Sequence, residues 1–194
     1  LLSHTYPLKA SLSGDYLLYY EKSISGNLGS GYCCSFNKAN GAITSIKTIF
    51  NSNVSFPNPN LALASVEISP NDSLIYVCTY ESFGNISRVT QFKRFLTLPG
   101  TAPIELINTT SPLYGMQIAP DGKIYISGIS SSIISCITRP DEISTACNFV
   151  YNYINISPST LGAGFPSVYF QLHRLKFTSN AFTPNSCISD SVHL

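Results

Sequence analysis

The chain has 194 residues, of which 44% are hydrophobic and only 11% are charged, and its formal net charge is +1. Disordered segments combine low hydrophobicity with high net charge, so this composition excludes a disordered chain. The near-neutral balance leaves no excess of lysine and arginine for phosphate groups, which argues against nucleic-acid binding. No apolar run approaches the roughly 20 residues that cross a bilayer, which argues against membrane insertion.

Three similar hairpins recur along the chain, each made of a short strand, a polar turn and a second apolar strand. They cover 8–20, 64–78 and 114–127. Alignment of Ser13 with Ser69 and Ala119 places the copies about 50 residues apart. Such a period is typical of a repeat architecture in which each copy is one supersecondary unit.

Residues that favour tight turns lie at the tips of these hairpins. Proline presets the backbone at the first turn position, aspartate accepts a hydrogen bond from its own backbone, and glycine tolerates a positive φ. The residues assigned to the turns are Gly14, Asp15, Pro70, Asp72, Pro120, Asp121 and Gly122. We place the three aspartates at equivalent turn positions on separate units. They are therefore expected to be structural, and no metal site is predicted from them.

Two further strands follow each hairpin. The third strands are predicted at 30–36, 87–95 and 133–138, and the fourth strands at 43–50, 104–108 and 148–154. Four strands in each repeat of about 50 residues predict an all-β fold, a partial β-propeller of about three four-stranded antiparallel blades. A β-sandwich also uses short strands with regular turns, but three similar hairpins favour the propeller.

The predicted blades cover about 8–50, 60–108 and 112–156, and a closing segment covers 161–177. Propellers typically have about four to eight blades, so three do not close a ring. We therefore expect the chain to be part of a longer polypeptide, or a processed product, and expect its open blade faces to favour association.

Glu67 and Gln117 occupy the same place in successive innermost strands and are the candidate ligand-binding residues of a central channel. A cation, a sugar or a chain of water molecules would suit them, and the alternative is polar filling of a solvated channel. Only Glu67 is ionisable, so a mechanism that needs paired carboxylates lacks its second group. No nucleophile motif and no glycine-rich phosphate loop occurs, so no catalytic residue and no cofactor is predicted.

The six cysteines are even in number and occur in a weakly charged chain, which fits an exported protein. Cys136 and Cys147 flank a turn-rich segment and are a possible disulfide. The alternative is that the cysteines are buried free thiols that act as small apolar residues.

The order of the segments Tyr114–Ile126, Ala146–Val150 and Leu161–Pro166 resembles the C-terminal part of the β-propeller domain of secreted Bacteroidetes-type surface proteins. Ser65–Pro70 resembles the preceding blade of that family. These proteins carry PKD repeats and a sorting domain for type IX secretion. The resemblance implies that 1–177 is a partial propeller and that 178–194 is a linker with the start of a PKD-like domain. It also implies a secreted or cell-surface location and no catalysis.

The sequence thus favours a non-enzymatic, exported β-propeller segment of a multidomain cell-surface protein, with a role in adhesion or as a protein-interaction scaffold. Its expected partners are other domains of the same polypeptide and a surface protein or glycan. Two alternatives stay open. One is a secreted propeller enzyme, a glycan hydrolase or lyase whose catalytic residues lie in missing blades. The other is a carbohydrate-binding module.

Overall fold

A computed structural model of the chain describes residues 8–22, 29–51, 61–81, 86–94, 103–162 and 165. The described residues form three four-stranded antiparallel sheets, and within each sheet the strands follow one another in sequence order. The helical element among them is the short 3-10 helix η1 (Ser144–Cys147). The predicted all-β class and the three four-stranded antiparallel sheets are confirmed.

Each sheet contains one predicted hairpin and the two strands after it. The first sheet consists of β1 (Lys9–Ala10), β2 (Tyr16–Lys22), β3 (Gly29–Phe36) and β4 (Ile43–Asn51). The second consists of β5 (Leu61–Ile68), β6 (Leu74–Glu81), β7 (Ile86–Lys93) and β8 (Ile104–Thr109). The third consists of β9 (Leu113–Ile118), β10 (Ile124–Gly128), β11 (Ile133–Ile137) and β12 (Phe149–Asn155). The predicted third and fourth strands agree with these bounds to within two residues.

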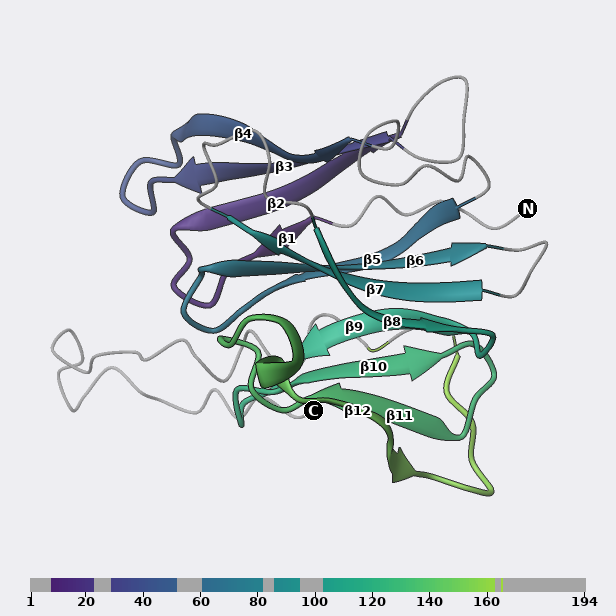
Figure 1. Cartoon of the computed structure of the whole chain (residues 1–194). Helices are drawn as coiled ribbons and strands as arrows, with labels where there is room; N and C mark the ends of the chain where they lie inside the picture. The colour runs from purple at the N-terminus through teal and green to yellow at the C-terminus, as the bar shows by residue number, and fades with distance from the viewer. Residues whose placement is uncertain are drawn as a thin grey trace, which may run out of the picture.

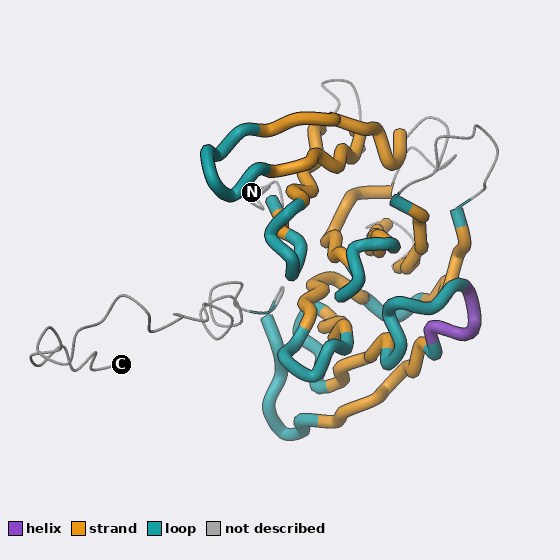
Figure 2. Tube along the Cα trace, turned by 90° about the vertical axis from the view of Figure 1, so that its left-hand side faces the viewer, coloured by secondary structure: helices purple, strands orange, loops and turns teal. Residues whose placement is uncertain are grey.

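The three sheets lie one above another, with the second sheet in the middle (Figure 1). The first strands of the sheets are neighbours, because β5 contacts both β1 and β9. The view turned by 90° shows the same layered arrangement, with η1 at the edge of the molecule (Figure 2). The hairpins therefore meet at one side of the stack, where their first strands are brought together.

Two hydrophobic cores fill the spaces between the sheets. Between the first and second sheets, Leu18 and Phe50 pack with Val77. Between the second and third sheets, Tyr76 packs with Ile126 and its neighbours. Strand β6 contributes to both cores and is buried at nearly every position, as expected for a strand that is covered on both faces.

The backbone bonds of the turns correct the alignment of the first hairpin. The N–H of Gly14 donates to the carbonyl of Ser11, and the equivalent bonds join Asp72 to Ser69 and Gly122 to Ala119, each at 2.9 Å. Ser11, and not Ser13, is therefore the counterpart of Ser69 and Ala119. The first turn lacks the proline that marks the other two, so the sequence pattern did not fix this register.

The side chains at the turn tips show the same shift. Ser13, Asn71 and Asp121 each accept a hydrogen bond from the backbone N–H two residues later. Gly14, Asp72 and Gly122 share a positive φ. The expectation that Asp15, Asp72 and Asp121 occupy equivalent positions is wrong, because Asp72 takes the place that glycine fills in the other two turns.

The described cysteines are buried free thiols, so the Cys136–Cys147 disulfide is not formed. Cys147 lies in the core between the second and third sheets. Cys136 alternates with Ile137, which belongs to that core, so the thiol of Cys136 faces the other side of the third sheet. The two sulfur atoms are separated by the sheet itself.

Most of the predicted closing segment lies outside the described residues. Leu161 forms an isolated antiparallel bridge with Ser131, and residues 162 and 165 are also described. The predicted linker and PKD-like start at 178–194 lie outside the described part of the chain.

Candidate functional site

A polar cluster forms where the first strands of the three sheets meet. Lys9, Glu67 and Gln117 each lie two residues before the turn residues Ser11, Ser69 and Ala119, so they are equivalent positions of the three hairpins. The Nζ atom of Lys9 lies 3.2 Å from Oε2 of Glu67 and 3.0 Å from Oε1 of Gln117. One ammonium group thus connects all three sheets.

The structure therefore brings the two predicted channel residues together and adds Lys9 to them. Sequence reasoning missed Lys9 because the first hairpin was aligned two residues out of register. In the corrected alignment of the three hairpins, Lys9 occupies the same position as Glu67 and Gln117. The available signal in the sequence was a basic residue at the position where the other two hairpins have an acid and an amide.

Glu67 also binds the backbone of the neighbouring sheet. Its Oε2 accepts a hydrogen bond from the N–H of Ile118 at 3.1 Å, and its Oε1 accepts one from the N–H of Ile68 at 3.1 Å. Two residues earlier, Oγ of Ser65 accepts a bond from the N–H of Met116 at 2.9 Å. The side chains of β5 thus satisfy the outer edge of β9, which is the end strand of the third sheet among the described residues.

Burial governs the electrostatics of the cluster. Glu67 is 2% exposed and the Lys9 side chain is 16% exposed. Loss of hydration raises the pKa of Glu67, while the ammonium of Lys9 and the two backbone donors oppose that rise. A buried pair of this kind is costly to break on one side only, because the remaining charge keeps its loss of hydration without a partner. The arrangement is suited to joining the sheets.

A second buried network fastens the loop before β12 to the middle sheet. The hydroxyl of Tyr76 donates to the carbonyl of Pro140 at 2.8 Å and accepts from Nε2 of Gln91 at 2.8 Å. Oε1 of Gln91 accepts from the N–H of Ser144 at 2.9 Å. Burial raises the pKa of Tyr76, so this hydroxyl stays protonated and keeps its role as a donor.

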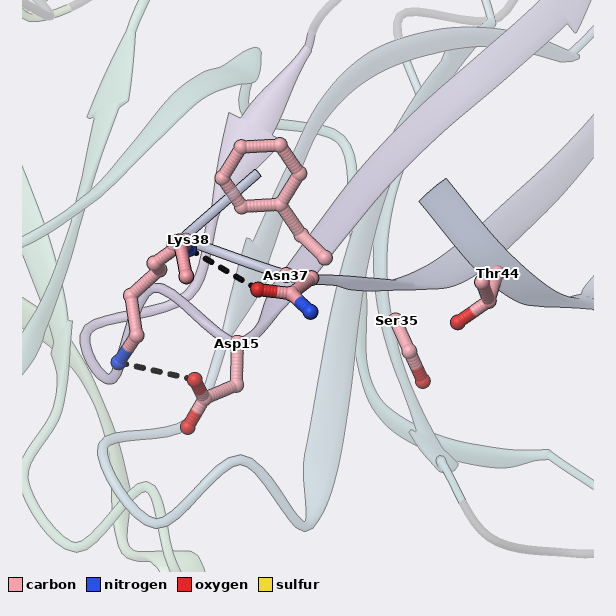
Figure 3. A pocket seen from close by; sticks show the side chains of 7 residues that line it. Asp15, Ser35, Asn37, Lys38 and Thr44 are labelled. Carbon is pink, nitrogen blue, oxygen red and sulfur yellow. Dashed lines mark hydrogen bonds and ion pairs between the residues drawn. The ribbon is translucent and has the colours of Figure 1, made fainter. Parts of the chain in front are cut away.

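An open pocket of about 460 Å³ lies between two turns of the first sheet (Figure 3). Nζ of Lys38 reaches from the β3–β4 turn to Oδ1 of Asp15 at 2.9 Å and to the carbonyl of Ser13 at 2.8 Å. The hydrogen bond with Lys38 holds the pKa of Asp15 below its usual range. Both partners are more than half exposed, and exposed ion pairs contribute little to stability. The pocket is an open gap between the two turns.

A smaller cavity of about 150 Å³ lies beside the contact between the first and second sheets, and Tyr16, Lys47 and Arg94 are among its lining residues. The Arg94 guanidinium lies 3.5 Å from the centre of the Tyr16 ring, and its Nε donates to the carbonyl of Asp72. Stacking of a guanidinium on an aromatic face is favourable, so Arg94, which follows β7 of the second sheet, links that sheet to Tyr16 of the first sheet.

Among the described residues, no group of three histidine, cysteine, aspartate or glutamate side chains is arranged to hold a metal ion. The same part of the chain has no helix of the length and apolarity needed to cross a membrane.

No family model matches the chain, and no curated protein matches it. Among solved structures, the chain is similar to hydrazine synthase of Kuenenia stuttgartiensis, with 17% sequence identity and a TM-score of 0.42. The similarity covers 66% of this chain and 38% of that chain. A likeness at this level assigns neither a fold nor an activity to the chain.

Proposed function

We propose that the three sheets are consecutive blades of a β-propeller, and that this segment serves as a non-enzymatic scaffold for adhesion or protein interaction in an exported, multidomain cell-surface protein. The observation that carries the proposal is the meeting of Lys9, Glu67 and Gln117 from equivalent positions of three innermost strands. Equivalent residues of successive blades face a common axis in a propeller. In an aligned sandwich the sheets pack face to face and their edge strands need not converge.

The contacts of the cluster support a structural role at this axis. The carboxylate of Glu67 accepts hydrogen bonds from Lys9 and from two backbone N–H groups. Oε1 of Gln117 accepts from Lys9, and its Nε2 donates to the carbonyl of Ile118. The polar groups of Lys9, Glu67 and Gln117 are thus used to hold neighbouring blades together. A scaffold needs such contacts at its centre to keep its blades in a fixed arrangement.

The family resemblance supports the proposed location. The segments at 114–126 and 146–150 resemble a secreted propeller family. The aromatic side chains of the two end sheets supply contact area for a protein partner. Tyrosine combines a large apolar ring with a polar tip, which is common at interfaces.

The experiment displays the chain on a non-adherent bacterial host and measures attachment of the cells to surfaces coated with mixed serum protein. Tyr19 of β2 and Tyr32 of β3 stack with their ring centroids 5.0 Å apart. We expect more attachment than for cells without the chain, and loss of the excess when these two residues are replaced by alanine. The Asp15→Asn variant alters an exposed turn away from these rings and is the matched control.

In parallel, the purified chain is incubated with a panel of polysaccharides. Release of cleavage products that Glu67→Gln abolishes without changing the melting temperature would overturn the proposal in favour of an enzyme. Attachment to glycan-coated surfaces alone would overturn it in favour of a carbohydrate-binding module.

A further inference from the structure

The smaller cavity, of about 150 Å³, is lined by residues of two sheets. The described lining residues are Tyr16 of β2, Cys33, Cys34 and Ser35 of β3, Ser45 and Lys47 of β4, and Arg94, which follows β7. Sites for organic ligands of drug size usually take about 300–1,000 Å³, so this cavity suits a smaller guest. A guest in it would contact the first and second sheets at once.

The charges around the cavity are positive. Among the described lining residues, Lys47 and Arg94 are cations and none is an acid. Burial raises the pKa of the Cys33 thiol to about 11, and the positive charges of Arg94 and Lys47 both oppose that rise. The two cations therefore act on the same point of the cavity wall, although they come from different sheets. Like charges that are brought together repel, and an anion between them relieves the repulsion.

Arg94 is held in a fixed orientation. It is 7% exposed, its guanidinium lies 3.5 Å from the centre of the Tyr16 ring, and its Nε donates to the backbone carbonyl of Asp72. The negative charge of Asp72 also acts on Cys33, but Asp72 binds Nε of Arg94 through its backbone. A guanidinium carries five N–H groups in a rigid plane, and this geometry matches the oxygens of a phosphate or a similar oxyanion.

A bulge in β4 forms another part of the cavity wall. Ser45 and Ile46 lie opposite the single residue Cys34 of β3, where the register of the two strands shifts. Ser45 holds a φ of 51°, a conformation that glycine adopts more readily than serine. Bulges redirect side chains and are common beside ligand sites. The lining residues Ser35 and Ser45 add hydroxyl groups, which are further hydrogen-bond donors for an anion.

We propose that this cavity binds a small tetrahedral oxyanion, phosphate or sulfate, between the guanidinium of Arg94 and the ammonium of Lys47. Lys47 is exposed and Arg94 is buried, so the ion enters from solvent past the lysine and binds the arginine at the inner end. Because Lys47 belongs to the first sheet and Arg94 follows a strand of the second, the bound ion fastens these two sheets to each other. This site goes beyond the proposed scaffold function and does not depend on it.

Thermal unfolding of the full chain tests the proposal. Differential scanning fluorimetry compares sodium phosphate and sodium sulfate with sodium chloride at equal ionic strength. An ion that binds only the folded chain raises the melting temperature as its concentration rises, and we expect a rise of a few degrees. Sulfate and phosphate also stabilise folded proteins without binding, because they are excluded from protein surfaces. The comparison of variants therefore decides the result.

Lys47→Met removes one of the two cations at an exposed position and should lose most of the rise that phosphate causes. Lys123→Met removes one positive charge from the third sheet and is the matched control, so it should keep the rise of the wild type. Arg94→Lys keeps the charge but loses the planar donor group, and it should also reduce the rise. Circular dichroism checks that each variant folds. If the buried substitution at Arg94 prevents folding, the pair of lysine variants alone decides.

Phenyl phosphate distinguishes a free ion from the phosphate end of a larger molecule. We expect it to raise the melting temperature much less than phosphate, because the cavity has no room for the ring. An equal rise with phenyl phosphate would overturn a site for the free ion. A rise with phosphate that is the same in the wild type, Lys47→Met and Lys123→Met would overturn the site altogether, and so would a wild type that melts alike in phosphate and chloride.

Discussion

Glu67 is an ionisable residue that lies almost fully out of water and still has a complete set of partners. Its carboxylate accepts hydrogen bonds from the ammonium of Lys9 and from the backbone N–H groups of Ile68 and Ile118. Glu67→Ala would leave two backbone donors and one ammonium group without their acceptor. We expect the free energy of unfolding to fall by about 3–5 kcal/mol at neutral pH, the range for breaking one side of a buried pair. Urea denaturation measures the loss, with Glu105→Ala, at a partly exposed ion pair, as the control.

The pH dependence of stability carries a separate signature of Glu67. Burial raises the pKa of this carboxyl above its ordinary value of 4.5. The folded state then binds the proton more tightly than the unfolded state, so this contribution to stability is full below pH 4.5 and is lost as the pH rises through the folded pKa. Relative to Glu67→Gln, the wild type should therefore lose stability as the pH rises above 4.5. A difference that stays constant with pH would contradict this expectation.

The buried cysteines define a second test at single residues. Burial raises the pKa of Cys33 and Cys136 to about 11 and the pKa of Cys78 to about 12. Since the thiolate is the reactive form, these thiols should resist iodoacetamide at pH 8 in the folded chain. Mass spectrometry should find the five cysteines of the described residues alkylated after unfolding without a reductant. Two fewer alkylated residues, Cys136 and Cys147, would show that the disulfide forms after all.

The turns of the three hairpins show what a residue contributes to an element. Asp72 holds a φ of 62°, while its counterparts Gly14 and Gly122 are glycines with similar angles. Oδ1 of Asp72 is also buried without a hydrogen-bond partner. Asp72→Gly removes both penalties, so we expect it to raise the free energy of unfolding by about 1 kcal/mol. Gly122→Ala should lower it by a similar amount, and thermal melting compares the two.

A loss of stability in Asp72→Gly would mean that the carboxylate stabilises the turn, for example through the nearby Arg94, whose Nε binds the Asp72 carbonyl.

The same turns also show how much of the fold could be predicted from the sequence. Pro70 and Pro120 marked two hairpins correctly, and strand bounds followed from alternating apolar residues. The first hairpin has no proline, so its register and the place of Lys9 came only from backbone bonds.

The contacts that join the sheets could not be predicted from the sequence for a related reason. Lys9 and Gln117 are 108 positions apart, and no local pattern pairs residues at that distance. The column of Glu67 and Gln117 was nevertheless predictable, because successive repeats place equivalent residues on equivalent strands. The repeat thus predicted a long-range relation between residues that the pattern of a single strand does not predict.

At the scale of the whole molecule, the order of the sheets determines which of their faces are covered. The middle sheet is covered on both faces, and its strand β6 is buried almost throughout. Each end sheet has one face in a core and one face with exposed aliphatic or aromatic side chains.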